Sequence, residues 1–527
     1  MRTFSFIERK RLLKRLGEKH YDVIIIGGGI TGTGIALDCV TRGLKTLLVE
    51  MQDFAAGTSS RSTKLVHGGL RYLKQFEINM VAEVGKERAI VYENAPHVTH
   101  PEWMLLPIYK KGTFGKLSTS AGLRVYDFLA GVKKNEKRQM LSREETLAKE
   151  PLLKKDGLIG GGYYVEYRTD DARLTIEVAK KAFEKGADLL NYTKAEGFLY
   201  EGGKISGVKV RDVFTDKLYE ATCQKVVNAT GPWVEKIIEK DKKIKGKGLI
   251  HTKGVHIVID NERFPLKQAV YFDTPDGRMV FAIPRDGKTY VGTTDTFFEG
   301  DLSNPPILEE DKEYLISCIQ YMFPDLGINI DDIESGWSGV RPLIQEEGKG
   351  PSEISRKDEI WVSESGLITI AGGKLTGYRK MAETVTDMLA KLLDEDGIKS
   401  SPCITRKLRL SGGEFESPKE YELFIGRKSK ELQEIGLCEE DARRIAAVYG
   451  TNADIVASME SLLLPDVELP LTIKLLVHYS IMHEMAITPE DLFIRRTGAS
   501  LFNVNWVRKW EEPVTLYMKK CIDIITE

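Results

Sequence analysis

Two apolar, β-branched runs near the start of the chain flank a stretch with helical spacing. The first run covers residues 22–26, a glycine-rich turn and the helical stretch follow it, and the second run ends at Glu50. A strand that is buried on both faces of a parallel sheet is apolar throughout. The pattern therefore predicts a strand, a helix and a second strand in that order.

Further along, helical and strand-like spacings alternate. Residues 77–93 and 171–188 have the spacing of helices. Residues 195–211 predict a β-hairpin whose turn is Glu201–Lys204. Residues 225–229 predict a buried strand that ends in a glycine turn. This part of the chain continues the mixed α/β pattern.

Residues 250–300 have a different character. They contain short alternating strands with turn residues between them, which predicts an antiparallel sheet in a separate domain. Near residues 360–393 the first pattern returns as two strand-like runs and a helix, so the first domain is predicted to be discontinuous. From about Ser400 the chain is predicted to be mainly helical. The predicted boundaries are 19–88, 158–247 and 346–398 for the first domain, 89–157 and 248–345 for the second, and 399–527 for the helical third.

Composition narrows the class of protein. A chain of 527 residues with 42% hydrophobic residues has room for several domains of about 100–200 residues each. The net charge of −2 gives no indication of a nucleic-acid partner. The six cysteines are far apart and form no C-x-x-C pair. This spacing argues against a metal site or a disulfide framework and fits a reducing cytosol.

The N-terminus is basic, and it lacks the apolar core of a secretory signal. The sequence contains no apolar run of about 18 residues that would predict a membrane-spanning helix. Residues 4–19 interleave basic and apolar side chains, which allows two interpretations. The segment is either an amphipathic helix on an anionic membrane surface or a lead-in helix whose leucines pack on the first domain. We favour the lead-in helix.

The glycine turn after the first strand has the spacing of a dinucleotide-binding site. Gly27, Gly29 and Gly32 form G-x-G-x-x-G between a strand and a helix. The turn allows backbone to approach a diphosphate, and the helix N-terminus directs N–H groups at it. Glu50, at the end of the second strand, can accept hydrogen bonds from a ribose and disfavours NADP. The motif alone does not choose between FAD and NAD.

Two further segments can supply donors to an anion. Gly57–Lys64 is dense in hydroxyl groups and is either part of a phosphate or flavin site or a flexible polar loop. Ile370–Thr376 ends a strand and begins a helix. Its N–H groups can stabilise the negative charge of a reduced flavin, or the segment is only a helix cap.

Several histidines and arginines are candidates for chemistry. A histidine side chain can titrate near neutral pH, so His67 is a candidate base, with a structural histidine as the alternative. His256 is a second candidate base or a core histidine. His478 and His483 are five residues apart and do not share a helical face, so no metal site is predicted.

Seven motifs together are similar to those of the FAD-dependent glycerol-3-phosphate dehydrogenases. They are VIIIGGGITGTGIALD, GTSSRSTKLVHGGLRYL, VVNATGPW, KGVHIVI, GTTDT, SGVRPL and IAGGKLTGYRKMAE. The resemblance runs from about residue 20 to the end and is weakest at residues 110–160. It implies an α/β fold with a discontinuous glutathione-reductase-like FAD-binding domain. An antiparallel β-sheet substrate domain like that of D-amino-acid oxidase and a C-terminal helical domain complete the implied fold.

The resemblance also implies site residues. The implied catalytic residues are His67, Arg341, Lys374 and His256, and the implied substrate-binding residues are Arg71, Tyr72, Arg341, Arg356 and Lys374. Arg356 is expected chiefly at the substrate phosphate, since arginine binds phosphate bidentately. From the residues alone, both Arg341 and Arg356 could instead form surface salt bridges, and for Arg356 this is the favoured interpretation. The implied cofactor-binding residues are Gly27, Gly29, Ile30, Thr31, Gly32, Glu50, Thr58, Ser59, Ser60, Ser62, Thr63, Lys64, His67, Gly68, Gly69, Ala229, Thr230, Gly231, Trp233, Gly372, Gly373, Lys374, Leu375 and Thr376.

The implied reaction is oxidation of sn-glycerol 3-phosphate to dihydroxyacetone phosphate, with hydride transfer to N5 of FAD. The family passes the electrons to membrane quinone, which implies a cytoplasmic protein that is peripheral on the inner face of the cell membrane. We expect a homodimer. The alternative is a glycerophosphate oxidase that reduces oxygen to hydrogen peroxide, but such oxidases carry an extra internal segment that this chain lacks. A non-enzymatic flavoprotein and an NAD-dependent dehydrogenase are the two further alternatives.

Overall fold

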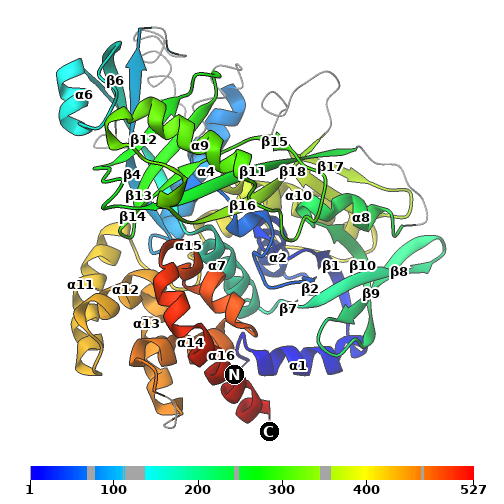
Figure 1. Cartoon of the computed structure of the whole chain (residues 1–527). Helices are drawn as coiled ribbons and strands as arrows, with labels where there is room; N and C mark the ends of the chain where they lie inside the picture. Colours follow the sequence, from blue (N-terminus) through cyan, green and yellow to red (C-terminus); the bar gives the residue numbers. More distant parts are fainter. Residues whose placement is uncertain are drawn as a thin grey trace.

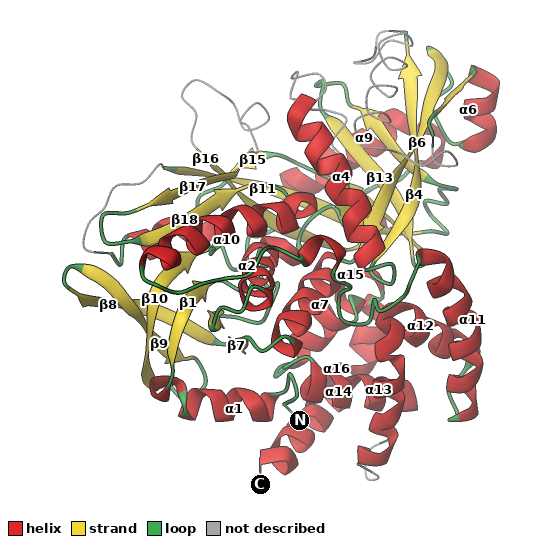
Figure 2. Ribbon diagram, turned by 180° about the vertical axis from the view of Figure 1, so that it is seen from behind, coloured by secondary structure: helices red, strands yellow, loops and turns green. Residues whose placement is uncertain are grey.

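The structure of the protein is a computed structural model. It describes residues 2–67, 78–110, 112, 137–241, 248–344, 358–464 and 468–526. The described chain forms two β-sheets, and the C-terminal helices gather on one side of them (Figures 1 and 2).

The first sheet contains the predicted strand–helix–strand unit. β1 (His20–Ile26), α2 (Ile30–Thr41) and β2 (Thr46–Val49) follow one another, and β1 lies parallel to β2. The strand order is β17–β18–β10–β1–β2–β7, with β8 and β9 attached through β10. The other strands are β7 (Asp188–Leu190), β8 (Thr193–Glu201), β9 (Lys204–Asp212), β10 (Leu218–Asn228), β17 (Asp358–Val362) and β18 (Leu367–Gly372).

Strands from separate stretches of the chain build this sheet, as the return of the first pattern near residue 360 predicts. β10 lies parallel to β1 on one side and to β18 on the other. β8 and β9 form the predicted hairpin, with Gly202 and Gly203 at its turn. Because β1, β2, β10 and β18 are parallel, their carboxyl ends lie along one edge of the sheet.

The first sheet is buried on both faces. Val23 and Ile25 of β1 face a core that includes α2, α7 (Asp171–Glu184) and α10 (Tyr378–Glu395). Ile24 and Ile26 face a second core on the other side of the sheet, which includes the β8–β9 hairpin. Burial on both faces of the sheet explains the continuous apolar run in the sequence, as predicted.

The basic N-terminal segment is a lead-in helix. Leu12 and Leu13, near the end of α1 (Phe6–Lys14), and Leu16 are buried in the core beneath the first sheet. Arg9 is buried as well and forms an ion pair with Asp212 of β9. The apolar side chains of the helix are thus buried against protein, which confirms the favoured interpretation.

The second sheet has the order β15–β11–β14–β13–β12–β4–β6–β3, with β16 beside β11 and β5 beside β6. Neighbouring strands are antiparallel, as predicted, except that β12 lies parallel to β4. Its strands are β3 (Leu65–Val66), β4 (Thr99–Tyr109), β5 (Gln139–Leu141), β6 (Leu158–Thr169), β11 (Leu249–Asp260), β12 (Ala269–Asp273), β13 (Met279–Arg285), β14 (Lys288–Gly292), β15 (Thr296–Phe297) and β16 (Ile333–Ile344). The helices near this sheet are α4 (Ile78–Asn94), α6 (Arg143–Lys149) and α9 (Glu309–Met322).

Two strands of the second sheet come from segments that the sequence predicts for the first domain. β3 and β6 fall inside segments predicted for the first domain, yet they pair with each other, and β6 pairs with β4, in the second sheet. The physical reason is that β6 is long and buried along almost its whole length, like a strand of either sheet. Its apolar content does not reveal which partner it takes.

The C-terminal part is helical, as predicted. Its helices are α11 (Pro418–Glu434), α12 (Glu439–Tyr449), α13 (Ala453–Ser458), α14 (Leu471–His483), α15 (Ala499–Phe502) and α16 (Val504–Thr526), and α8 (Val234–Ile238) lies apart from them, after β10. Ser417 caps α11 by accepting a hydrogen bond from the N–H of Glu420. Among the helices that the structure describes, none is long and apolar enough to cross a membrane.

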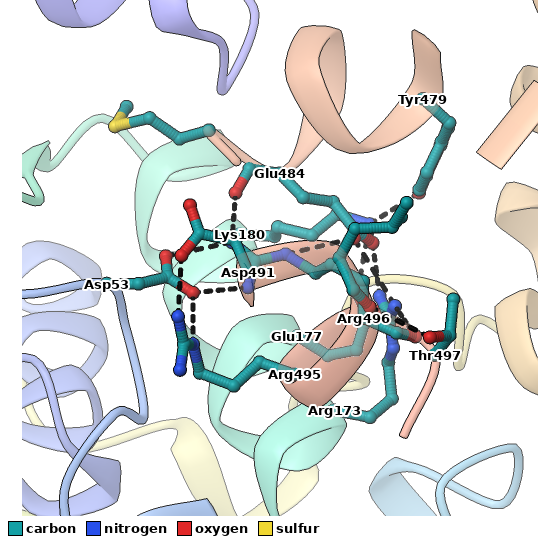
Figure 3. A network of polar contacts seen from close by, with 12 residues as sticks. Asp53, Arg173, Glu177, Lys180, Tyr479, Glu484, Asp491, Arg495, Arg496 and Thr497 are labelled. Atoms are coloured by element: carbon teal, nitrogen blue, oxygen red, sulfur yellow. Dashed lines mark hydrogen bonds and ion pairs between the residues drawn. The ribbon is translucent and has the colours of Figure 1, made fainter. Parts of the chain in front are cut away.

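A buried ion-pair network joins the C-terminal helices to the first sheet (Figure 3). Asp53, in the loop after β2, accepts hydrogen bonds from Arg495 at 2.6 Å and from Arg496 at 2.6 and 2.9 Å. Glu484, which follows α14, pairs with Arg173 of α7. Each of these side chains is at most 4% exposed. Glu177, Lys180 and Asp491 form ion pairs with members of this set, and we call these eight residues together the junction network.

Candidate active site

A cavity of about 790 Å³ lies where the two sheets meet. On one side it is lined by the segments that follow β1, β2, β10 and β18 at the carboxyl edge of the first sheet. On the other side it is lined by residues of the second sheet, among them Tyr271, Phe281 and Arg341. Ligands bind at this edge of open parallel sheets because the loops there diverge and leave a crevice.

The glycine turn after β1 has the close packing that a dinucleotide site requires. Gly27 has a φ of 113°, and a Cβ atom there would lie 2.5 Å from the carbonyl oxygen of Ala229. A Cβ atom on Gly32 would lie 1.9 Å from the carbonyl oxygen of Gly27. Neither position accepts a side chain. Gly29, the N-cap of α2, and Ile30, its first residue, line the cavity, so α2 begins at the cavity wall.

Glu50 lines the same end of the cavity. Its carboxylate accepts hydrogen bonds from the N–H groups of Gly28 at 2.6 Å and Gln52 at 2.8 Å. Burial raises the pKa of Glu50 even though these donors act to lower it. A partly desolvated acceptor at this position suits the hydroxyl groups of a ribose.

The polar loop Gly57–Lys64 has one side at the cavity and one side in the protein. Thr58, Ser59, Ser62 and Thr63 line the cavity. The side chain of Lys64 points the other way and bonds to Asp171 at 2.7 Å and to the carbonyl of Ser60 at 3.0 Å.

Asp171 also accepts hydrogen bonds from Ser62, through its N–H at 3.0 Å and its hydroxyl at 2.7 Å. The first residue of α7 therefore fixes the polar loop from behind. Ser60, Lys64 and Gly32 do not appear among the cavity-lining residues. Their position favours a role in shaping the loop and the turn.

His67 and the helix start after β18 meet at the cavity. The hydroxyl of Thr376 accepts a hydrogen bond from the N–H of His67 at 3.1 Å and donates one to its carbonyl at 3.3 Å. The imidazole lies edge-on to Phe281, with 6.1 Å between ring centroids. Lys374 lines the cavity beside this contact. Two motifs that are far apart in the sequence thus form one wall.

Arg341 of β16 reaches the cavity across β11. Its guanidinium bonds to Asp295 at 3.2 Å and to the hydroxyl of Thr293 at 3.1 Å. A Cβ atom on Gly254 of β11 would lie 2.4 Å from an Arg341 nitrogen. The glycine of the KGVH motif therefore makes room for the arginine, which is only 20% exposed.

His256 is a core residue behind the cavity wall and does not line the cavity. Its ring stacks on Trp337 with 4.7 Å between centroids, and its Nε2 lies 3.0 Å from the hydroxyl of Thr63. Burial, followed by the charges of Arg341 and Lys64, lowers its pKa well below the usual value. A neutral imidazole that positions Thr63 fits this environment.

Most of the other predicted cofactor residues come together around the cavity. Gly27, Gly29, Ile30, Thr31, Ala229, Thr230, Gly231, Trp233, Gly372, Gly373, Lys374, Leu375 and Thr376 all line it. Gly68, Gly69, Arg71, Tyr72 and Arg356 lie outside the described residues, and their roles stay predictions.

Several cavity residues were missed by the sequence analysis. Tyr271 and Phe281 stack on each other at 4.1 Å beside His67, and Tyr164 and Arg278 also line the cavity. Tyr164, Tyr271 and Phe281 lie on strands of the second sheet, and Arg278 directly precedes β13. The alternation of these strands predicts a sheet face but not which face meets the cavity. Arg61 lies inside the motif GTSSRSTKLVHGGLRYL, and its positive charge is a signal in the sequence for a contact with an anion.

Comparison with known proteins identifies the family. The profile of the family described as FAD dependent oxidoreductase matches residues 22–379. The profile described as C-terminal domain of alpha-glycerophosphate oxidase matches residues 403–523. The chain belongs to the FAD-dependent oxidoreductase family, and the resemblance seen in the sequence is confirmed.

The relatives narrow this class. The chain is 61% identical to an aerobic glycerol-3-phosphate dehydrogenase of Bacillus subtilis, over 98% of this chain and 94% of that protein. It is 57% identical to the Staphylococcus aureus protein of the same name, over 99% of this chain and 94% of that protein. A glycerol-3-phosphate dehydrogenase of Bacillus halodurans, solved in complex with FAD, superposes with a TM-score of 0.84 at 47% identity. The match covers 98% of this chain and 94% of that one.

A more distant solved structure supports the fold alone. The L-alpha-glycerophosphate oxidase of Mycoplasma pneumoniae, solved with FAD bound, matches with a TM-score of 0.58 at 18% identity. The match covers 73% of this chain and 96% of that one.

Proposed function

We propose that this protein is an FAD-dependent glycerol-3-phosphate dehydrogenase that oxidises sn-glycerol 3-phosphate to dihydroxyacetone phosphate. The observation that carries the proposal is that a single cavity contains both a dinucleotide-type glycine turn and charged or titratable side chains suited to a substrate. The glycine turn and Glu50 line one end of the cavity, and His67, Lys374 and Arg341 line the same cavity. The near full-length similarity to proteins named aerobic glycerol-3-phosphate dehydrogenase supports the same substrate.

The residues present fit FAD. The glycine turn leaves no side chain between α2 and the cavity, Glu50 offers an acceptor for the ribose, and Gly57–Lys64 offers hydroxyl groups. The start of the segment Leu375–Gly377, after β18, would face the flavin. Bound FAD would supply the hydride acceptor that the side chains of the protein cannot supply.

The protein's own contribution is to bind, orient and deprotonate the substrate. Arg341 is held by Asp295 and Thr293, so its charge is fixed in place for an oxyanion or a phosphate. His67 is the base we assign to the substrate hydroxyl, because Thr376 fixes its backbone at the cavity. Tyr271 and Phe281 line the site as a stacked aromatic pair, which makes this part of the wall apolar. Arg71, Tyr72 and Arg356 remain sequence-based candidates for the phosphate.

Membrane quinone is the proposed electron acceptor. A membrane acceptor implies a peripheral protein on the inner face of the cell membrane. This location and the expected homodimer are proposals drawn from the resemblance alone. The oxidase alternative is the second candidate, since one C-terminal profile takes its name from an oxidase.

One titration tests these alternatives. The purified yellow protein is mixed with sn-glycerol 3-phosphate without oxygen, and the visible flavin band is followed. We expect bleaching, slow return of colour in air with peroxide formed only at that slow rate, and rapid return with a soluble quinone. Rapid peroxide formation would indicate an oxidase, and unchanged colour would indicate a non-enzymatic flavoprotein. A colourless protein that needs added nicotinamide would indicate an NAD-dependent enzyme.

A further inference from the structure

Arg61 lies at the cavity wall directly after the short 3₁₀ segment Thr58–Ser60. This segment is in contact with the glycine turn, because the hydroxyl of Ser59 accepts a hydrogen bond from the N–H of Ile30 at 2.9 Å. A Cβ atom on Gly29 would lie 3.0 Å from the same hydroxyl oxygen. The backbone that carries Arg61 is therefore fixed next to the start of α2.

The guanidinium of Arg61 has no hydrogen bond or ion pair with the residues that the structure describes. Two carboxylates act on it from a distance, Glu490 and Asp301. Glu490 already pairs with Arg495 at 3.5 Å, and Asp301 accepts a hydrogen bond from the N–H of Ser303 at 2.9 Å. Burial and the charge of Arg495 together lower the pKa of Arg61.

The junction network does not compensate this charge. It contains as many carboxylates as cations, and each carboxylate is already paired within it. Its carboxylates are Asp53, Glu177, Glu484 and Asp491, and its cations are Arg173, Lys180, Arg495 and Arg496. Other arginines of the cavity have partners, since Arg341 pairs with Asp295 and Arg278 with Asp276. Arg61 is thus a cation at the cavity wall that lacks an anion among the described residues.

We propose that Arg61 is a ligand of the diphosphate of FAD, bound opposite the N-terminus of α2. This inference rests on the FAD-dependent function proposed above. The helix end offers N–H groups and a partial positive charge, and Arg61 would add a full charge in a planar, bidentate geometry. No residue prediction from the sequence assigned a role to Arg61.

The proposal separates cofactor affinity from chemistry. The diphosphate carries the same charge whether the flavin is oxidised or reduced. Removal of Arg61 should therefore weaken FAD binding without changing the rate at which substrate reduces the bound flavin. A role at the substrate phosphate predicts the reverse, which is a higher KM with normal FAD retention.

The test compares Arg61→Gln and Arg61→Lys with the wild-type holoenzyme. Arg427→Gln is the matched control, because Arg427 is 72% exposed and lies on α11, far along the chain from the cavity segments. Release of FAD after dilution is followed by the rise in flavin fluorescence, and substrate KM is measured with excess FAD. We expect about 10- to 100-fold weaker FAD binding for Arg61→Gln and a smaller loss for Arg61→Lys. KM should stay within about twofold.

Unchanged FAD release in Arg61→Gln would overturn the proposal, as would a raised KM with normal FAD release. A general structural role would lower the thermal midpoint of the FAD-free protein, whereas a ligand role reduces only the stabilisation that added FAD gives. If Arg61→Gln does not fold, the loss of affinity in Arg61→Lys decides alone. Failure of wild-type protein to bind FAD would reject the proposed function itself, which is a separate outcome.

Discussion

Two carboxylates of the loop after β2 have different environments and opposite pKa shifts. Glu50 lines the cavity and accepts hydrogen bonds from backbone N–H groups, and burial raises its pKa. Asp53, three residues further on, is buried in the junction network. Burial alone would raise the pKa of Asp53, but Arg496 and Arg495 outweigh it and lower the pKa.

The difference shows how one short loop serves two regions. The junction network is closed, because each charge has an opposite charge beside it, and a closed network of this kind fixes one arrangement of the packed elements. The cavity is open, since its donors and acceptors are arranged for groups that the protein does not itself supply. Buried polar groups without protein partners are costly, so they persist where a ligand satisfies them.

The largest expected effect concerns chemistry in the cavity. His67→Gln should slow anaerobic reduction of the flavin by substrate by about 10²- to 10⁴-fold, because general-base catalysis contributes a factor of this size. FAD content should stay normal, since the contact with Thr376 uses the backbone of His67. Stopped-flow absorbance measures the rate. A rate within twofold of wild type would reject His67 as the base.

The next effect concerns stability at the junction. Asp53→Asn leaves Arg495 and Arg496 without their shared carboxylate and should cost about 3–5 kcal/mol of unfolding free energy. Urea denaturation measures the loss. Asp387→Asn is the control, because Asp387 is 54% exposed in its pair with Arg42 and should cost less than about 1 kcal/mol.

Asp53→Asn should also change how the unfolding free energy depends on pH. Since the pKa of Asp53 is lowered in the folded protein, its contribution is present above the ordinary value of 3.8 and is lost as the pH falls below it. Asp53→Asn should therefore flatten the acid side of the stability curve. An unchanged acid limb would show that Asp53 is not held as an ion.

A third effect addresses the substrate side of the cavity. Arg341→Ala should lower kcat/KM for sn-glycerol 3-phosphate by about 10- to 100-fold, as expected for loss of a charge-assisted contact. Arg341→Lys should recover part of the loss. A kcat/KM within about twofold of wild type in Arg341→Ala would reject the contact between Arg341 and the substrate.

The smallest effect completes the comparison of the two carboxylates. Glu50→Gln should weaken FAD binding by about tenfold, because an amide is a poorer acceptor for ribose hydroxyls. The unfolding free energy of the FAD-free protein should change by less than about 1 kcal/mol, in contrast to Asp53→Asn. Equal destabilisation by both substitutions would remove the distinction between cavity and junction.

Local signals predicted the parts of the molecule that local sequence determines. The turn at Gly27 and Gly32, the acid at Glu50 and the hairpin turn at Gly202 are each set by a few adjacent residues. The spacing also predicted that separate stretches of the chain build the first sheet, because apolar β-branched runs return near β18.

Long-range contacts set the rest. Nothing in the spacing of Gly57–Lys64 distinguishes the hydroxyl of Ser59, at the cavity, from Lys64, which binds Asp171 behind the loop. The facing of Tyr271 and Phe281 depends on which side of the second sheet meets the first. His256 is aligned with Gly292 of β14, and a Cβ atom there would lie 2.1 Å from the imidazole. The histidine therefore needs this partner strand for its space, and its own strand pattern does not show that.

The position of β18 has a consequence for synthesis on the ribosome. β18 pairs with β10 in the interior of the first sheet, yet it is made about 140 residues after β10. Until Leu367–Gly372 leaves the exit tunnel, Val226–Asn228 of β10 lack this partner strand, and open strand edges are sites of aggregation. A nascent chain stalled before this point should depend on chaperones, and a single late segment of six residues ends that dependence.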